Sequence, residues 1–370
     1  MTMFYDDNIQ TDLSYIRKKI GDKNIRFDSK TVLITGGAGF LGYYLSYYFM
    51  HLRAENIAAV SVVLTDNFMR GKPNWISELE LNFGSAFRTI VHDVVKPLPP
   101  EVIDCNPDYI IHAASIASPI FYRKSPIETM DANVLGLRSL LDYAVERKRT
   151  TRPVQGFLFF SSSEIYGSPD PEFIPTPEYY NGNVSCTGPR ACYDESKRFG
   201  ETLCVNFAHQ HQIPITIARP FNNYGPGLKL KDGRVVSDFA SNILNGEDIV
   251  LLSDGSASRT FCYIADAVHG YLLVLLCGSP GEPYNIGIEK PEISIKKFAE
   301  LFSSIGQQVT GCRSIIVTAK SEDPNYTVDN PERRCPDISK ARSIGYDPTV
   351  TLEDGLHRTL LWYQKFKMTW

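Results

Sequence analysis

The sequence predicts an α/β protein whose core is a doubly wound, parallel β-sheet, followed by a smaller mixed α/β lobe. Two observations predict this class. Near the N-terminus, TVLITGGAGFLGYYLSYYFMHL reads as a β-branched strand, a glycine-rich turn and an apolar helix. Beyond it, apolar runs of strand length alternate with segments of helical pattern, namely VSVVLTD, RTIVHD, DYIIHAAS, GFLFF and ITIARP.

Composition narrows the class of partner. With 370 residues, 43% of them hydrophobic and 22% charged, the chain is long enough to bury a large core. The net charge is -4 and the basic residues are dispersed, which argues against a nucleic-acid partner. The chain has no run of 18 apolar residues, and its N-terminal residues are polar, unlike a membrane span or a signal peptide. We expect a cytoplasmic protein.

The cysteine pattern predicts neither disulfides nor a metal site. Eight cysteines are spread along the chain without a C-x-x-C pair or a Cys/His cluster at zinc spacing. We therefore expect reduced thiols. Cys192, directly before Tyr193, is interpreted as a small residue that fills space near a pocket, with alkylation of an exposed thiol as the alternative.

The chain divides into three parts. Residues 1–28 are expected to be an extension ahead of the core, with a short amphipathic helix around Thr11–Ile20. Residues 29–226 form the predicted dinucleotide-binding domain. Residues 227–370, in which the elements become shorter, form mainly a smaller lobe, with some elements free to return to the first domain.

The glycine-rich turn predicts the cofactor. Gly36, Gly39 and Gly42 form a GxxGxxG pattern between a strand and a helix, the context of a Rossmann dinucleotide site. Glycine lets the backbone turn tightly and approach a pyrophosphate, which then lies at the positive end of the helix. The next strand ends at Asp66, whose carboxylate would accept hydrogen bonds from the adenosine ribose and repel the extra phosphate of NADP. NAD is the expected cofactor.

A second group of residues predicts acid/base chemistry. The strand GFLFF is followed by Ser163 and Glu164, polar groups that a buried strand would present at a pocket. Tyr193 and Lys197 are four residues apart in a helical segment, so their side chains share one face. A neighbouring ammonium favours an ionised phenol, and we expect it to lower the pKa of Tyr193 towards that of a useful base. An exposed ion pair is the alternative.

Together, the motifs resemble those of one enzyme superfamily. GGAGFLG, HDVVKPL, HAASIASP, SSSEIYG, GPRACYDESKR, ARPFNNYGP and DGRVVSDF resemble the extended short-chain dehydrogenase/reductases, and most of all the UDP-glucuronate decarboxylases, or UDP-xylose synthases. The resemblance covers nearly all of the chain after the extension. It implies a Rossmann domain with a nucleotide-sugar lobe, NAD, a UDP-linked sugar as substrate, and a homodimer formed through helices expected at 126–149 and 191–211.

The resemblance also implies roles for single residues. The implied catalytic residues are Tyr193, Lys197, Ser163, Glu164 and Arg334. The implied cofactor contacts are Gly36, Gly39, Phe40, Leu41, Gly42, Asp66, Asn67, Asp93, Val94, Ala113, Ser162, Tyr193 and Lys197. The implied contacts to the nucleotide sugar are Ser118, Asn222, Arg234 and Arg259. Either Ser162 or Ser163 matches the hydroxyl that binds the reacting sugar oxygen. Two positions depart from the family pattern, Cys335 and Ser115.

The implied reaction is redox-neutral overall. Tyr193 takes the proton of the sugar 4-hydroxyl while NAD accepts the hydride from C4. The product is a β-keto acid, which can lose CO2 while Glu164 and Arg334 position the carboxylate and manage the proton at C5. Return of the hydride gives UDP-xylose, and earlier release gives the 4-keto pentose.

Other functions share these residues. A 4-epimerase or an apiose-type synthase is the second reading. A 4,6-dehydratase would need an acidic pair where this chain has Ser163 and Glu164. A non-catalytic NAD-binding regulator would have no need of Tyr193, Lys197 or Ser163.

Overall fold

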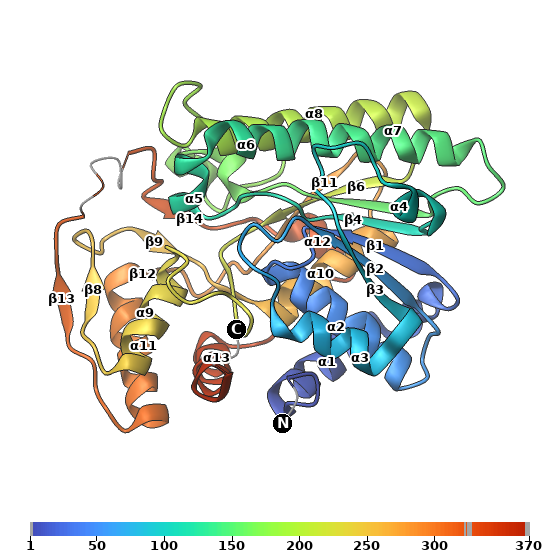
Figure 1. Cartoon of the computed structure of the whole chain (residues 1–370). Helices are drawn as coiled ribbons and strands as arrows, with labels where there is room; N and C mark the ends of the chain where they lie inside the picture. The colour runs from blue at the N-terminus through green and yellow to red at the C-terminus, as the bar shows by residue number, and fades with distance from the viewer. Residues whose placement is uncertain (1–2, 322, 324–327, 367–370) are drawn as a thin grey trace.

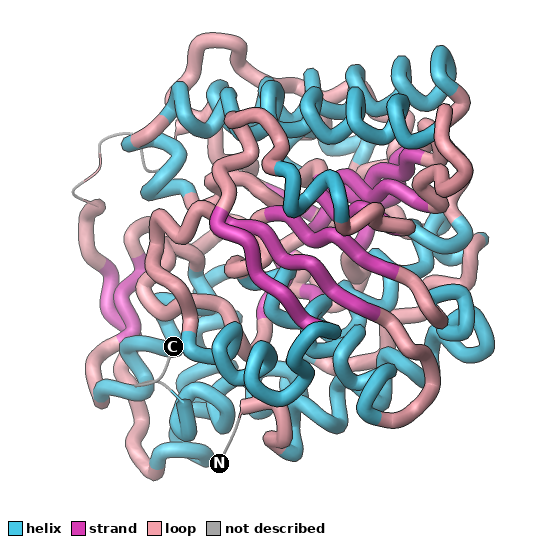
Figure 2. Tube along the Cα trace, turned by 45° about the vertical axis from the view of Figure 1, so that its right-hand side comes forward, coloured by secondary structure: helices cyan, strands magenta, loops and turns pink. Residues whose placement is uncertain are grey.

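The centre of the computed structural model, which describes residues 3–321, 323 and 328–366, is a parallel sheet of seven strands (Figures 1 and 2). Their order is β11-β6-β5-β4-β1-β2-β3. The strands are β1 (Thr31–Thr35), β2 (Ser61–Asp66), β3 (Phe87–Val91), β4 (Tyr109–His112), β5 (Gly156–Phe160), β6 (Ile215–Pro220) and β11 (Pro283–Ile286). The order reverses between β1 and β4, and dinucleotides bind in such sheets at the carboxyl ends beside this reversal. The predicted doubly wound fold is confirmed.

Helices cover both faces of the sheet because its strands are apolar on both sides. In β1, Leu33 packs in one core while Val32 and Ile34 pack in the other. One face carries α6 (Pro126–Asp131), α7 (Leu137–Lys148) and α8 (Ala191–His211), at the top of Figure 1. The opposite face carries α1 (Asp7–Ile20), α2 (Phe40–Ala54), α3 (Asn74–Phe83) and α10 (Ile264–Cys277).

The N-terminal segment belongs to the core, which corrects the expected extension. Helix α1 begins at Asp7, with Asp6 accepting hydrogen bonds as its N-cap, and is therefore longer than the helix expected around Thr11–Ile20. Its buried residues recur at helical spacing and pack against α2 and α10: Ile9, Leu13, Ile16 and Ile20. A 3-10 helix, η1 (Gly21–Phe27), then leads into β1.

The helix expected at 126–149 contains a π-helical turn. This turn, η3 (Ala132–Gly136), joins α6 to α7 and places Asn133 against α8. The Asn133 Nδ2 donates a hydrogen bond of 2.9 Å to Ser196 Oγ, which in turn donates to the backbone oxygen of Tyr193 at 3.0 Å. A π turn often marks a functional site, and this one supports the first turns of α8.

The smaller lobe lies beside the carboxyl ends of the sheet (Figure 1). Its helices are α9 (Val235–Asn245), α11 (Ile295–Thr310) and α13 (Leu352–Phe366), whereas the short helix α12 (Ser339–Ser343) contacts β11 of the main sheet. Its short strands pair as β8 (Ile249–Leu251) with β13 (Ile316–Thr318), and as β12 (Ile293–Ser294), β9 (Ser258–Arg259) and β14 (Arg333–Arg334). Two further strands, β7 (Asn223–Tyr224) and β10 (Cys262–Tyr263), pair with each other. From residues 227–370, α10 and β11 return to the main sheet.

Candidate active site

A cleft of about 2000 Å³ lies between the carboxyl ends of the strands and the smaller lobe. Every residue that the sequence assigns to catalysis, cofactor or substrate lines it. The short helices α4 (Pro100–Asp104) and α5 (Pro119–Lys124) follow β3 and β4, and α5 forms part of the cleft wall.

Among the described residues, no helix is long and apolar enough to span a membrane.

The glycine-rich turn fits a dinucleotide. Gly36 has φ +66°, and a Cβ there would lie 2.3 Å from the backbone of Ala114. A Cβ on Gly42 would lie 2.1 Å from the Gly37 oxygen, so α2 can pack this closely on the turn only with glycine. Gly39 caps α2 without a side chain, which leaves the first N–H groups of the helix available to a pyrophosphate.

Asp66 supports the same turn. Its carboxylate accepts hydrogen bonds from the backbone N–H groups of Ala38 at 3.0 Å and Phe68 at 2.8 Å. Burial raises its pKa, although these two bonds oppose that shift. A carboxylate has about four acceptor sites, so Asp66 keeps capacity for a ribose hydroxyl.

Ser115 also lines the cleft. Its Oγ is buried and has no hydrogen-bond partner among the described residues, so it is available to contact a bound cofactor.

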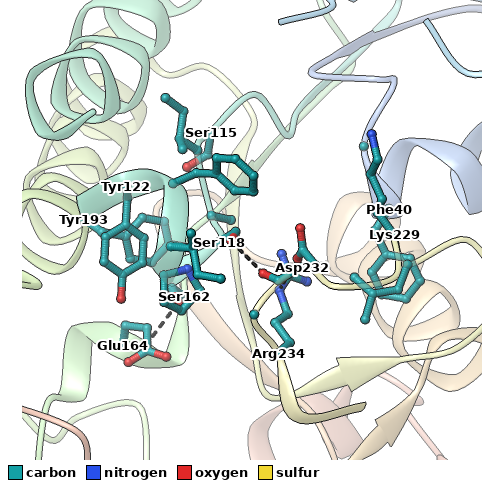
Figure 3. Close-up of a pocket in the computed structure, with 18 of the residues that line it drawn as sticks. Phe40, Ser115, Ser118, Tyr122, Ser162, Glu164, Tyr193, Lys229, Asp232 and Arg234 are labelled. Atoms are coloured by element: carbon teal, nitrogen blue, oxygen red, sulfur yellow. Dashed lines mark hydrogen bonds and ion pairs between the residues drawn. The ribbon is translucent and has the colours of Figure 1, made fainter. Parts of the chain in front are cut away.

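Tyr193 and Lys197 share the buried face of α8, as expected from their spacing. The Tyr193 ring stacks on Tyr122 with 5.1 Å between centroids, and Figure 3 shows the two rings close together. The Lys197 Nζ donates a hydrogen bond of 2.8 Å to the Phe160 oxygen at the end of β5. It lies 5.8 Å from the Tyr193 ring centroid.

The expected lowering of the phenol pKa is wrong for the protein alone. Burial raises the pKa of Tyr193 to about 12, and the charge of Glu164 adds to this while a hydrogen bond with Ser162 opposes it. Burial also lowers the pKa of Lys197 to about 7, so its charge is weakened near neutral pH. Desolvation is the largest effect on the pKa of both groups.

Of the two serines that the sequence leaves open, Ser162 is the one that contacts Tyr193. Its Oγ also accepts a hydrogen bond of 3.2 Å from the Glu164 N–H and so caps the 3-10 helix η4 (Ser163–Tyr166) (Figure 3). Ser163 lines the same cleft one residue further along. The geometry therefore favours Ser162 as the hydroxyl beside the phenol.

Glu164 is held by two arginines. Arg334 Nη2 donates to its carboxylate at 2.7 Å, and Arg190 Nη2 donates to the same oxygen, Oε2. Burial opposes the ionisation of Glu164, but the charges of these arginines prevail and hold its pKa well below the usual range. Arg334 reaches this point because β14 pairs with β9, which sets Arg334 beside Arg259. Glu164 and Arg334 thus form a salt bridge inside the cleft.

Two members of this cluster, Arg190 and Asp194, were missed from the sequence. Arg190 precedes α8 and lies 3.7 Å from Asp194 on the first turn. Burial, together with the charge of Glu164, raises the pKa of Asp194. The signal was present in GPRACYDESK, where an arginine and an aspartate four residues apart flank Tyr193.

The residues assigned to the nucleotide sugar fall into two groups. Near Glu164, Asn222 accepts from Arg334 at 3.5 Å, and Arg259 donates to backbone oxygens of Ser258, Pro331 and Glu332. Elsewhere in the cleft, Ser118 donates to the Asp232 backbone oxygen at 2.7 Å, and Arg234 lies 3.1 Å from the Asp232 carboxylate.

Cys192 is a packed residue. Its thiol donates to the Tyr122 oxygen at 3.5 Å, and burial raises its pKa, which disfavours the reactive thiolate. This agrees with the interpretation of a space-filling side chain.

Comparison with known proteins gives consistent matches. Residues 32–287 match the model of the NAD dependent epimerase/dehydratase family. The chain is 39% identical over 330 residues to UDP-glucuronic acid decarboxylase 3 of Arabidopsis thaliana, covering 88% of this chain and 86% of the relative. It is 38% identical over 343 residues to UDP-glucuronic acid decarboxylase 1 of Xenopus tropicalis, covering 91% of this chain and 73% of the relative.

Among solved structures, the chain resembles a UDP-glucuronic acid 4-epimerase from Bacillus cereus in complex with UDP-glucuronic acid and NAD. The TM-score is 0.72 and the identity 25%, with 91% of this chain and 99% of the other covered.

Proposed function

The chain belongs to the NAD-dependent epimerase/dehydratase family, and from this premise we propose that it decarboxylates UDP-glucuronate through a 4-keto intermediate. Its curated relatives named above are UDP-glucuronic acid decarboxylases. The observation that carries the proposal is the convergence of Arg190 and Arg334 on Glu164 in the same cleft as Tyr193.

The charge of this cluster suits an anionic sugar. Arg190, Arg259 and Arg334 all act on the Glu164 carboxylate. Burial and the charge of Glu164 raise the pKa of Asp194 and so disfavour its ionised form, and Asp329 and Glu292 act on the cluster through Asp194 and Arg259. Glu164 is thus the carboxylate on which three buried or half-buried cations converge, and a positive excess remains around it when Asp194 is protonated. A buried positive excess favours a second carboxylate from the substrate. A neutral hexose, the substrate of a dehydratase or of a simple hexose epimerase, would not provide it.

Oxidation at C4 relies on Tyr193 and Ser162. NAD held by the glycine-rich turn and Asp66 would supply the acceptor and later donor of the C4 hydride, and its positive charge would favour the ionised phenol that burial alone disfavours. Ser162 holds the sugar 4-oxygen beside Tyr193, and Tyr193 receives its proton. The hydrogen bond of Lys197 to Phe160 fixes the ammonium beneath the phenol. Tyr193 returns the proton when the 4-keto group is reduced.

Loss of CO2 relies on the arginine cluster. The C5–carboxyl bond breaks and CO2 is released, its electron pair moves into the enolate of the 4-keto group, and a proton from solvent water then adds at C5. Ser162 stabilises the enolate oxygen by donating a hydrogen bond. Glu164 accepts hydrogen bonds from both Arg190 and Arg334 and so positions these two cations beside the substrate carboxylate and atom C5.

A UDP-glucuronate 4-epimerase is the second candidate, since one of the structural neighbours with that name was solved with UDP-glucuronic acid. Both enzymes oxidise C4 of the same substrate, and only the fate of the carboxylate separates them. Incubation with UDP-glucuronate and NAD in deuterium oxide distinguishes them by proton NMR. Decarboxylation gives a pentose with one deuterium at C5, whereas a hexuronate inverted at C4 without deuterium would overturn the proposal.

We also propose a homodimer and a cytoplasmic location. The outer surface of α6 to α8 exposes Ile127, Leu135 and Phe199, which supports pairing with the same surface of a second copy. All eight cysteines are free thiols in the structure, which supports a reducing compartment.

A further inference from the structure

The segment 227–234, here called the strap, crosses the cleft between its two walls. At its start, a Cβ on Gly227 would lie 2.5 Å from Tyr43, so the backbone packs directly on α2, the helix of the glycine-rich turn. At its end, a Cβ on Gly233 would lie 2.5 Å from Ile120, so the backbone packs directly on α5. Residues of the strap line the cleft. A dinucleotide at the N-terminus of α2 would therefore lie beneath it.

Arg70 fastens the strap to the nucleotide-binding domain. It follows Asp66 in the loop after β2, and its Nη1 lies 2.6 Å from the Asp232 carboxylate. The Arg70 guanidinium also stacks on Phe121, 4.5 Å from the ring centroid. From the strap, Lys229 Nζ donates to the Arg70 backbone oxygen at 3.1 Å. The side chain and the backbone of Arg70 are thus both tied across the cleft.

Asp232 is built to hold this contact. Its side chain is 1% exposed, and that of Arg70 is 38% exposed. Its backbone oxygen accepts from Ser118, which fixes the strap to the segment after β4 (Figure 3). A buried carboxylate needs a cation, and Arg70 supplies it from the opposite wall, with Arg234 as the second.

We propose that the Arg70–Asp232 ion pair is a latch that holds the strap over bound NAD(H) and keeps NADH in the cleft between the two hydride transfers. Opening the cleft requires this pair to break and the Lys229 contact with it. A latched cofactor returns its hydride before it leaves, so the sugar departs as the reduced pentose. This last consequence rests on the proposed function, whereas the retention of NADH does not.

The test is the rate of NADH release in the absence of sugar. Protein loaded with NADH is mixed with excess NAD, and the loss of NADH fluorescence is followed by stopped flow. The variant Arg70→Gln keeps an apolar stem against Phe121 and removes the charge. We expect its release rate to rise about tenfold, because losing one partner of a buried pair acts mainly on dissociation. Arg70→Lys should lie between this variant and the wild type.

A matched control is available in the same loop. Lys72 pairs with Glu80 on α3 at 2.9 Å, on its own side of the cleft, and Lys72→Ala should release NADH at the wild-type rate. Arg234 still pairs with Asp232 in Arg70→Gln, so unfolding is not expected. Asp232→Asn removes the charge that both Arg70 and Arg234 contact, so in combination with Arg70→Gln it should add only the effect of losing the Arg234 contact.

The salt dependence of the NADH release rate separates an ion-pair latch from a purely structural role of Arg70, because only the ion pair is weakened by salt. Raising ionic strength should speed NADH release from the wild type and much less from Arg70→Gln. A release rate of Arg70→Gln within twofold of wild type would overturn the latch. With UDP-glucuronate, the same variant should release more 4-keto pentose and free NADH; if no decarboxylation occurs at all, the sugar-free release rates still decide the proposal.

Discussion

Arg334 donates a hydrogen bond of 2.7 Å to Glu164, a residue 170 positions earlier in the chain. The contact joins β14 of the smaller lobe to the 3-10 helix that follows β5 of the main sheet. It therefore joins the two sides of the cleft, so the position of the Glu164 carboxylate depends on how the smaller lobe sits on the main sheet. Arg190 completes this contact from the start of α8.

The Glu164–Arg334 pair is predicted to act on the carboxylate step. Glu164→Gln and Arg334→Ala should each lower kcat for CO2 release by about a hundredfold, the scale expected for a positioned acid/base or charged group. NAD affinity should stay within about twofold because neither residue lies in the glycine-rich turn. Carbon dioxide release from UDP-glucuronate and calorimetric NAD binding measure the two effects.

The neighbouring Arg333 provides the control for that pair. It pairs with Glu292 at 2.7 Å and is about half exposed, so Arg333→Ala should leave CO2 release unchanged. If Glu164→Gln or Arg334→Ala raised KM at unchanged kcat, these residues would anchor the sugar instead of acting on the carboxylate.

Tyr193→Phe is predicted to remove the proton acceptor and leave the fold intact. The phenylalanine ring keeps the stack on Tyr122, and only the hydroxyl contact with Ser162 is lost. We expect kcat to fall about a thousandfold, within the range for a general base. Steady-state kinetics measures this, with thermal unfolding and NAD binding as controls. Turnover near the wild-type rate would show that another residue is the general base.

Asp12 is predicted to make stability depend on pH. This buried carboxylate of α1 accepts hydrogen bonds from Tyr44 at 2.9 Å and Tyr263 at 2.6 Å, and pairs with Arg358 at 2.8 Å. Burial raises its pKa from 3.8 to about 6. Between these two values the folded state binds more protons than the unfolded state, so stability falls as pH rises through this window.

The variant Asp12→Asn removes that titration. The unfolding free energy of the wild type minus that of the variant should decrease between pH 3.8 and about 6, and be level above this window. Urea unfolding at a series of pH values measures the difference. Parallel profiles across the window would show that Asp12 does not titrate with this pKa.

NAD is predicted to bind more tightly than NADP. The Asp66 carboxylate lines the cleft and is fixed by the N–H groups of Ala38 and Phe68, so it cannot easily turn away from a 2′-phosphate. We expect at least about a tenfold ratio of the two Kd values, or 1.4 kcal/mol. Calorimetry with both cofactors is the measurement, and equal affinities would refute the role of Asp66.

The proposed dimer predicts where a charge should disrupt association. Leu135 and Phe199 are 53% and 50% exposed on the surface of η3 and α8. Glutamate at either position would place a charge in the apolar centre of the interface and should give a monomer by light scattering. Leu81→Glu, on α3 at the opposite face of the sheet, should remain a dimer. A monomeric wild type would reject the prediction.

Most of the fold could be predicted from the sequence because the patterns that indicate it are local. The order of strand, glycine-rich turn and helix is specific at Gly36 to Gly42, and the apolar strands show their burial on both faces directly. The N-terminal helix was expected, but its earlier start at Asp7 and its packing in the core were not, because α10, which it contacts most, lies far along the chain.

The site was less accessible to sequence reasoning. Glu164 and Arg334 were assigned to one site from the resemblance alone, and their contact was not predicted, since no local pattern joins residues so far apart. Arg190 was missed because its bond to Glu164 forms only when the loop between them folds back to α8. The raised pKa of Tyr193 depends on desolvation, which a spacing of four residues does not reveal.

The central claim is tested most directly by the fate of the substrate carboxyl carbon. UDP-glucuronate labelled at that carbon is incubated with the protein and a catalytic amount of NAD, and both gas and nucleotide sugar are assayed. We predict that the label leaves as CO2 in equal amount to the UDP-pentose formed. Label retained in a UDP-hexuronate of inverted C4 configuration would contradict the claim.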